Sequence, residues 1–181
     1  GTFALCYSAL HGNKVKNLIT TVTPVDFHTK NDLLSLMIRN MDVDLLVDTL
    51  GNIPGELLNW IYLSLKPFRL MGQKYMDLVN MLDDKEQTRN FMRMEKWIFD
   101  SPDQVGEAFR EFAKQFYQEN GLVKGTVVIG GQTVDLMKVT MPVLNIYAAA
   151  DHLVPADSSK SLRGCVGTDD YSEVEFPGGH I

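Results

Sequence analysis

The sequence is poor in several features that would assign it to a specialised class. Its 181 residues include two cysteines, Cys6 and Cys165, which are too few for a disulfide framework and match no zinc-binding spacing. No run approaches the roughly 18 apolar residues that a membrane-spanning helix needs. Lysines and arginines form no block and the net charge is −6, so nucleic acid or an anionic membrane is not an expected partner. The length and the 45% hydrophobic content predict one globular domain. The low cysteine content predicts a reducing, intracellular compartment.

The sequence also lacks an initiating methionine, and neither end has the composition of a natural terminus. It opens in an apolar stretch, residues 1–10, and stops at Pro-Gly-Gly-His-Ile, residues 177–181. Chain termini are usually polar and poorly ordered. We therefore expect an internal fragment of a longer protein, in which the absence of a targeting segment carries little information.

Apolar periodicity predicts alternating helices and strands near both ends of the chain. The expected elements are a helix at 3–10, a strand within 15–22, a hairpin at 126–134, a buried parallel strand at 141–148, a helix at 155–162 and a strand at 171–176. This order is typical of the C-terminal part of a parallel α/β sheet.

Residues 31–120, approximately, have a different pattern, in which helical periodicity dominates and methionine and aromatic residues are frequent. Ser101-Pro102-Asp103-Gln104 is predicted to be a capping box that opens a helix carrying Phe109 and Phe116. We interpret this stretch as a helical insertion within a domain spanning residues 1–181. It is either ordinary core or a mobile cap over an apolar acyl site, since methionine adapts to irregular ligands.

Two ionisable residues follow neighbouring predicted strands. Asp151 comes directly after the strand at 143–148, and His180 comes after the strand at 171–176. Functional groups gather at the carboxyl ends of strands in open α/β sheets. An acid followed by a histidine is the order of the α/β-hydrolase layout, where the carboxylate orients the imidazole and stabilises its protonated form. Asp151 and His180 are therefore the candidate catalytic acid and base.

A nucleophile is missing from this arrangement. In the α/β-hydrolase layout it lies on a sharp turn just before a helix, and the chain opens inside that helix. Cys6 lies too far into the apolar helix to occupy the turn, so we interpret it as a packing residue. Cys165, near two glycines, is interpreted as a loop thiol. The nucleophile is expected to precede Gly1.

Four segments, in this order, resemble the catalytic subunit of polyhydroxyalkanoate synthases. They are Gly1-Thr2-Phe3-Ala4-Leu5, Val22-Thr23-Pro24-Val25-Asp26-Phe27, Ala150-Asp151-His152-Leu153-Val154-Pro155 and Gly178-Gly179-His180-Ile181. The short cap region is most similar to the two-subunit synthases, whose catalytic chain works with an accessory subunit. The resemblance implies an α/β-hydrolase-like parallel sheet, Asp151 as the acid, His180 as the base, and a nucleophilic cysteine about three residues before Gly1.

The resemblance also implies the reaction. An (R)-3-hydroxyacyl thioester of coenzyme A would be the substrate, a growing polyester chain the product, and no further cofactor or metal would be needed. It implies a homo- or hetero-oligomer in the cytoplasm at polymer granules. By the same comparison His152 is a structural neighbour of the acid, and Asp26 is more consistent with a loop or capping carboxylate than with a catalyst.

Two alternatives remain open from the sequence. A serine α/β-hydrolase, either an esterase or a polymer depolymerase, would share Asp151, His180 and the sheet, and would differ in the residue at the missing turn. A non-catalytic granule-binding homologue would fold in the same way and would lack any nucleophile there.

Overall fold

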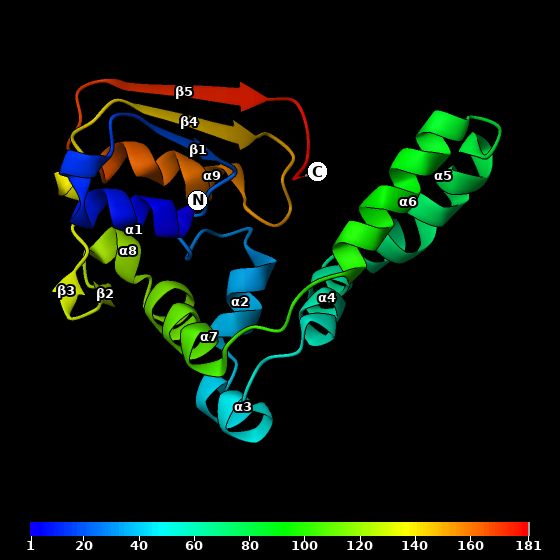
Figure 1. Ribbon diagram of the computed structural model, residues 1–181, viewed down its shortest axis with the longest axis horizontal. Coiled ribbons are helices and arrows are strands. Elements are labelled where there is room, and N and C mark those ends of the chain that lie inside the picture. Colours follow the sequence, from blue (N-terminus) through cyan, green and yellow to red (C-terminus); the bar gives the residue numbers. More distant parts are fainter. Residues whose placement is uncertain (181) are drawn as a thin grey trace. The chain divides into compact units, whose positions relative to one another are not determined.

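The structure is a computed structural model that describes residues 1–180 (Figure 1). Ile181, the last residue of the Gly-Gly-His-Ile segment, lies outside the described residues. The chain divides into two compact units. One comprises residues 1–41 together with the chain from Glu111 onward, and the other is Asp42–Arg110.

The first unit is built on a three-stranded parallel sheet with the order β1-β4-β5. Its strands are β1 (Leu18–Thr21), β4 (Val143–Ala148) and β5 (Tyr171–Phe176). In the central strand, Asn145 lies opposite Thr20 of β1 and Glu173 of β5. Because all three strands run in the same direction, their carboxyl ends meet at one edge of the sheet. The predicted parallel α/β arrangement is confirmed.

Helices and short turns complete this unit. They are α1 (Thr2–Leu10), η1 (Gly12–Lys14), α2 (Leu33–Arg39), η3 (Ala113–Gln118), α8 (Gly121–Lys124), η4 (Leu136–Lys138), α9 (Ala156–Lys160) and η5 (Ser161–Gly164), with the hairpin β2 (Val128–Ile129) and β3 (Gln132–Thr133). Figure 1 shows α1 and α9 next to the strands. Helix α1 buries Leu5, Cys6 and Ala9 in the core, whereas Phe3 and Tyr7 remain largely exposed.

The second unit is helical. It contains α3 (Val43–Leu50), α4 (Gly55–Ser64), η2 (Phe68–Gln73), α5 (Lys74–Met81) and α6 (Lys85–Phe99), and α7 (Gly106–Phe112) begins near its end. Aspartates cap two of these helices: Asp42 accepts a hydrogen bond from Leu45 N, and Asp84 accepts from Glu86 N and Gln87 N. Each cap satisfies backbone donors that have no partner within the helix.

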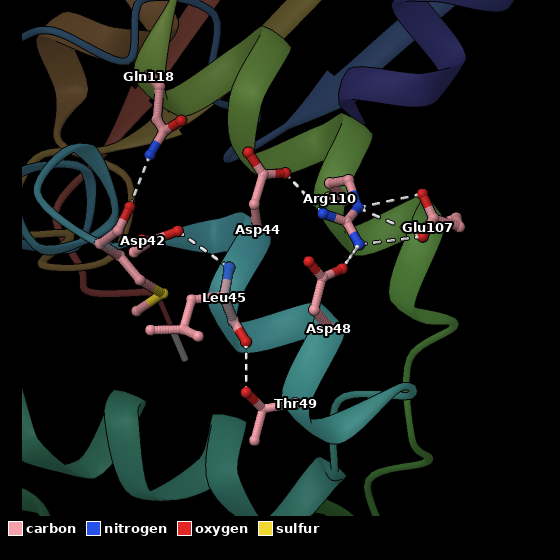
Figure 2. Close-up of polar contacts among 9 residues, drawn as sticks. Asp42, Asp44, Leu45, Asp48, Thr49, Glu107, Arg110 and Gln118 are labelled. Atoms are coloured by element: carbon pink, nitrogen blue, oxygen red, sulfur yellow. Dashed lines mark hydrogen bonds and ion pairs between the residues drawn. The ribbon is translucent and has the colours of Figure 1, made fainter.

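The incoming and outgoing segments of the helical unit are bonded to each other. Ile53 and Gln104 form a two-way backbone bridge, with N···O distances of 2.8 and 2.9 Å. A Cβ added at Gly106 would lie 2.0 Å from the Gly51 carbonyl oxygen, so this approach requires glycine. Arg110 binds Asp44 and Glu107 and also Asp48, as Figure 2 shows, with 2.6 Å separating it from each aspartate. We call these contacts the neck of the helical unit.

The neck explains one wrong prediction. Residues 101–104 do not open a helix, because α7 begins at Gly106. Asp103 instead accepts a hydrogen bond from Gly55 N at 3.0 Å, and Gln104 pairs with Ile53. Bonds to a distant segment therefore replace the local capping box. Helix α2 and η3 lie in the first unit, and the compact helical unit, residues 42–110, lies within the stretch 31–120 that the sequence predicts to be a helical insertion.

Candidate active site

The two loops that follow β4 and β5 bring Asp151 and His180 together. The strands are neighbours and parallel, and their pairing extends beyond their ends through Ala149 N to Phe176 O at 3.0 Å and Ala150 N to Gly178 O at 2.9 Å. The chain therefore leaves both strands side by side. His180 Nδ1 lies 2.8 Å from Asp151 Oδ2.

The Asp151 carboxylate is held on both of its oxygens. Its side chain is completely buried, Oδ2 faces His180, and Oδ1 accepts hydrogen bonds from Leu153 N at 2.8 Å and Val154 N at 2.9 Å. Burial raises the pKa of Asp151, but the hydrogen bonds from His180, Val154 and Leu153 outweigh it, so the pKa lies below its ordinary value. Asp151 is therefore a carboxylate at neutral pH.

The imidazole of His180 can bond a second group through its Nε2 atom. Its side chain is 27% exposed, and Nδ1 is the nitrogen that faces Asp151. A proton on Nδ1, donated to the carboxylate, leaves Nε2 as an acceptor. An imidazole oriented in this way can take a proton from a nucleophile or a hydroxyl and return it to a leaving group.

The start of α1 lies at the same edge of the sheet. Thr23 follows β1, and a Cβ added at Gly1 would lie 1.8 Å from Thr23 Oγ1. Thr2 Oγ1 donates to Pro24 O at 3.1 Å. Val22, just after β1, has φ +42°, a conformation that is rare for a β-branched residue. The N-terminus of α1 and the Asp151–His180 pair thus share one edge.

Neither cysteine is placed to act as a nucleophile. Cys6 is buried in the core, and burial raises its pKa to about 11. Cys165 is half-buried, and its pKa is raised by burial and by the charge of Asp26. A thiol becomes nucleophilic when its pKa falls, so both environments disfavour attack.

Asp26 has a structural setting in the loop after β1. Its Oδ1 accepts hydrogen bonds from His28 N and from Asn120 Nδ2, both at 2.8 Å. Asn120 in turn accepts from Phe27 N at 2.9 Å and adopts a left-handed conformation, φ +53°. These contacts fix the loop, as expected of a loop carboxylate. His152 is half-buried beside Asp151.

Sequence reasoning missed two buried serines that tie this loop to α9. Ser159 Oγ donates to Thr23 O at 2.5 Å, and Val25 N donates to Ser158 Oγ at 3.3 Å. Asn145, fully buried in β4, donates to Ser159 O and accepts from Thr20 Oγ1. A polar amide in the middle of an apolar strand was the available signal, since buried polar groups are almost always hydrogen-bonded.

Within residues 1–180 no group of three or more His, Cys, Asp or Glu side chains could hold a metal ion. None of the helices formed by these residues is both long and apolar enough to cross a bilayer.

Comparison with known proteins identifies a family. The sequence model of the alpha/beta hydrolase fold family matches residues 1–181. The chain is 63% identical to the poly(3-hydroxyalkanoate) polymerase subunit PhaC of Allochromatium vinosum over 181 residues, which is all of this chain and 51% of that protein. It is 50% identical to the Synechocystis polymerase subunit of the same name over 188 residues, which is all of this chain and 50% of that protein. The chain therefore spans about half the length of these curated relatives.

A solved structure agrees on the fold. The BpoC protein of Mycobacterium tuberculosis aligns with a TM-score of 0.50 and 14% identity, covering 98% of this chain and 55% of that one. Similarity at this level concerns the fold alone. The matches confirm both the expected fold class and the resemblance carried by the four sequence segments.

Proposed function

Because the chain belongs to the alpha/beta hydrolase fold family, and is 63% identical to a poly(3-hydroxyalkanoate) polymerase subunit, we propose that it is part of an acyltransferase. The reaction is polymerisation of (R)-3-hydroxyacyl-CoA into a polyester with release of coenzyme A. The observation that carries the proposal is the 2.8 Å contact between His180 Nδ1 and the buried carboxylate of Asp151, at the edge where α1 begins.

The first step proposed is acylation of a cysteine that precedes Gly1. His180 Nε2 removes the proton of the thiol, and the thiolate attacks the thioester carbonyl. The carbon–sulfur bond to coenzyme A then breaks, and the departing thiolate takes the proton from the imidazolium. One thioester replaces another, so the free-energy change of this step is small and the step is reversible.

The second step extends the polymer. The 3-hydroxyl of one acyl group attacks the thioester of another, which forms an oxoester and releases a thiol. A hydroxyl is a much weaker acid than a thiol and therefore depends more on a base. All three donors around Asp151, from His180, Leu153 and Val154, engage its buried oxygens. This supports a carboxylate that acts through His180 rather than on the hydroxyl directly.

The helical unit and the partners belong to the same proposal. We propose that the helical insertion, approximately residues 31–120, acts as a cap that keeps water from the acyl-enzyme, since hydrolysis would compete with chain growth. We also propose an accessory synthase subunit and assembly into oligomers, with a cytoplasmic site at the polymer granule; the name of the relatives, polymerase subunit, supports a partner subunit.

Replacement of His180 tests the proposal. In the chain extended to the length of its relatives, His180→Gln should leave the thiol mostly protonated near neutral pH and slow acylation strongly. Mass spectrometry at early times after mixing with a hydroxyacyl-CoA analogue should then detect little acyl-enzyme. His11→Gln, outside the pair, is the matched control and should acylate normally. Normal acylation of the His180 variant would contradict the proposal, and an acylated serine at the turn would instead favour a hydrolase.

A further inference from the structure

Helix α6 carries a row of four cations on one face. Lys85, Arg89, Arg93 and Lys96 are spaced by four, four and three residues, which places them within an arc of about 80° at 100° per residue. All four are exposed. None forms an ion pair with another residue of the described chain, 1–180.

The opposite face of α6 is the one that packs within the helical unit. Phe91 contacts the ring of Tyr75 edge-on, with ring centres 6.0 Å apart. Glu95 accepts hydrogen bonds from Lys74 Nζ at 2.8 Å and Tyr75 Oη at 2.7 Å. Figure 1 shows α5 and α6 side by side. Because Glu95 is neutralised on the packed side, the row of cations faces solvent with one carboxylate, Glu86, at its border.

Large apolar side chains flank the row. Trp97 lies on one side of it and is 67% exposed, and Met92 and Phe99 lie on the other, 58% and 52% exposed. Exposed tryptophan and methionine beside unpaired cations is the pattern of a helix that lies on a lipid surface, with the apolar groups in the interface and the cations at the phosphates.

We propose that α6 docks on an anionic lipid surface. The row extends roughly 16 Å along the helix, which suits an extended surface better than a single phosphorylated ligand. The apolar flanks favour lipid over duplex nucleic acid, whose phosphate backbone would engage the cations and leave the apolar side chains exposed. The sequence predicted no anionic membrane partner because no block of basic residues is visible, and the row forms only when the residues are wound on a helix. The row is therefore a local group of positive charges on a chain whose net charge is −6.

Vesicle binding by the chain extended to the length of its relatives tests the proposal. The protein should sediment with phosphatidylcholine vesicles that contain phosphatidylglycerol and not with phosphatidylcholine alone, and added salt should weaken binding. The double variant Arg89→Gln/Arg93→Gln should lower the partition coefficient roughly 30-fold. Trp97→Ser should lower it roughly threefold or more, with little dependence on salt.

Matched variants distinguish binding through the row of cations on α6 from an effect of the overall charge of the protein. Lys14→Gln/Lys16→Gln removes the same charge from exposed positions in the other unit and should change binding less than about twofold. Glu86→Gln should strengthen binding, and Arg93→Lys should preserve it. Equal losses in the two double variants, equal binding to neutral vesicles, or a preference for duplex DNA over the anionic vesicles would each overturn the proposal. All replaced side chains are exposed, so loss of folding is not an expected cause of weaker binding.

Discussion

The electrostatics of a single residue, Asp151, organise the candidate site. Its carboxylate is completely buried, yet three hydrogen-bond donors lower its pKa below the ordinary value. One donor is the histidine and two are backbone groups of the same loop, so the loop conformation and the charge depend on each other. A buried ionised carboxylate of this kind selects the imidazole tautomer that leaves Nε2 free to accept a proton.

Asp151→Asn should therefore separate the two proposed steps. The amide keeps the shape of the carboxylate but removes its charge, and its Nδ2 cannot accept the Nδ1 proton of His180. Because a few per cent of a cysteine is already thiolate near pH 7, acylation should tolerate the change better than elongation does. We expect elongation to fall about 10³-fold or more and acylation by much less. Single-turnover kinetics with saturating hydroxyacyl-CoA measures both, and accumulation of acyl-enzyme is the expected sign. An equal loss in the two steps would mean that the charge matters to both alike.

The two cysteines should be dispensable for turnover. Cys6→Ala and Cys165→Ser, each in the extended protein, should keep the rate within a few fold of the parent, because neither thiol is placed to be activated. Cys6→Ala should also lower the free energy of unfolding by roughly 1 kcal/mol, since it removes a buried sulfur. Steady-state kinetics and thermal unfolding separate the two effects. A folded variant that lost activity about 10³-fold would place the nucleophile within these residues.

At the level of elements, the sequence predicted the strands whose apolar residues follow a local pattern. The strand at 143–148 is rich in apolar residues, and in the strand at 171–176 apolar and polar residues alternate. Both strands form where expected. The Asp151–His180 contact follows from that order, because neighbouring parallel strands place their following loops together. The neck could not be predicted, since the Ile53–Gln104 bridge joins residues distant in sequence and overrides the capping signal at 101–104. The hydrogen bonds of Ser158 and Ser159 to the loop after β1 also join residues distant in sequence, and the polar Asn145 within β4 was the local signal for them.

Gly106→Ala should open the neck. The new Cβ would lie 2.0 Å from Gly51 O and 2.9 Å from Val47 Cγ1, so the two segments would have to move apart. Hydrogen exchange at the Ile53 and Gln104 amides, each of which donates to the carbonyl oxygen of the other residue across the neck, should speed up about tenfold or more. Gly72→Ala is the matched control, because its Cβ would meet no atom within 4 Å, and it should leave both amides protected. Unchanged exchange in the Gly106 variant would show that the neck absorbs the methyl group.

At the scale of the whole molecule, the chain carries the proposed acid and base beside a small parallel sheet. Its three strands pair in the order β1-β4-β5, which leaves one side of β1 without a partner strand among the described residues. Ile19 in that strand is 65% exposed. An unpaired edge with apolar side chains is prone to association with other chains. A chain that spans about half of its relatives is therefore expected to depend on further sequence for both stability and activity.

The 181 residues expressed alone should accordingly be inactive. They hold the proposed acid and base but no cysteine placed to be acylated, and the open edge of β1 should cause aggregation or loose packing. The same chain extended to the length of its relatives should release coenzyme A from hydroxybutyryl-CoA, and that release should disappear when the cysteine expected about three residues before Gly1 becomes alanine. A thiol-reactive dye can follow coenzyme A release in all three samples, with light scattering to record aggregation. Release by the 181 residues alone would show that the nucleophile lies within them, and Cys165, the thiol that is not fully buried, would then be the first position to replace.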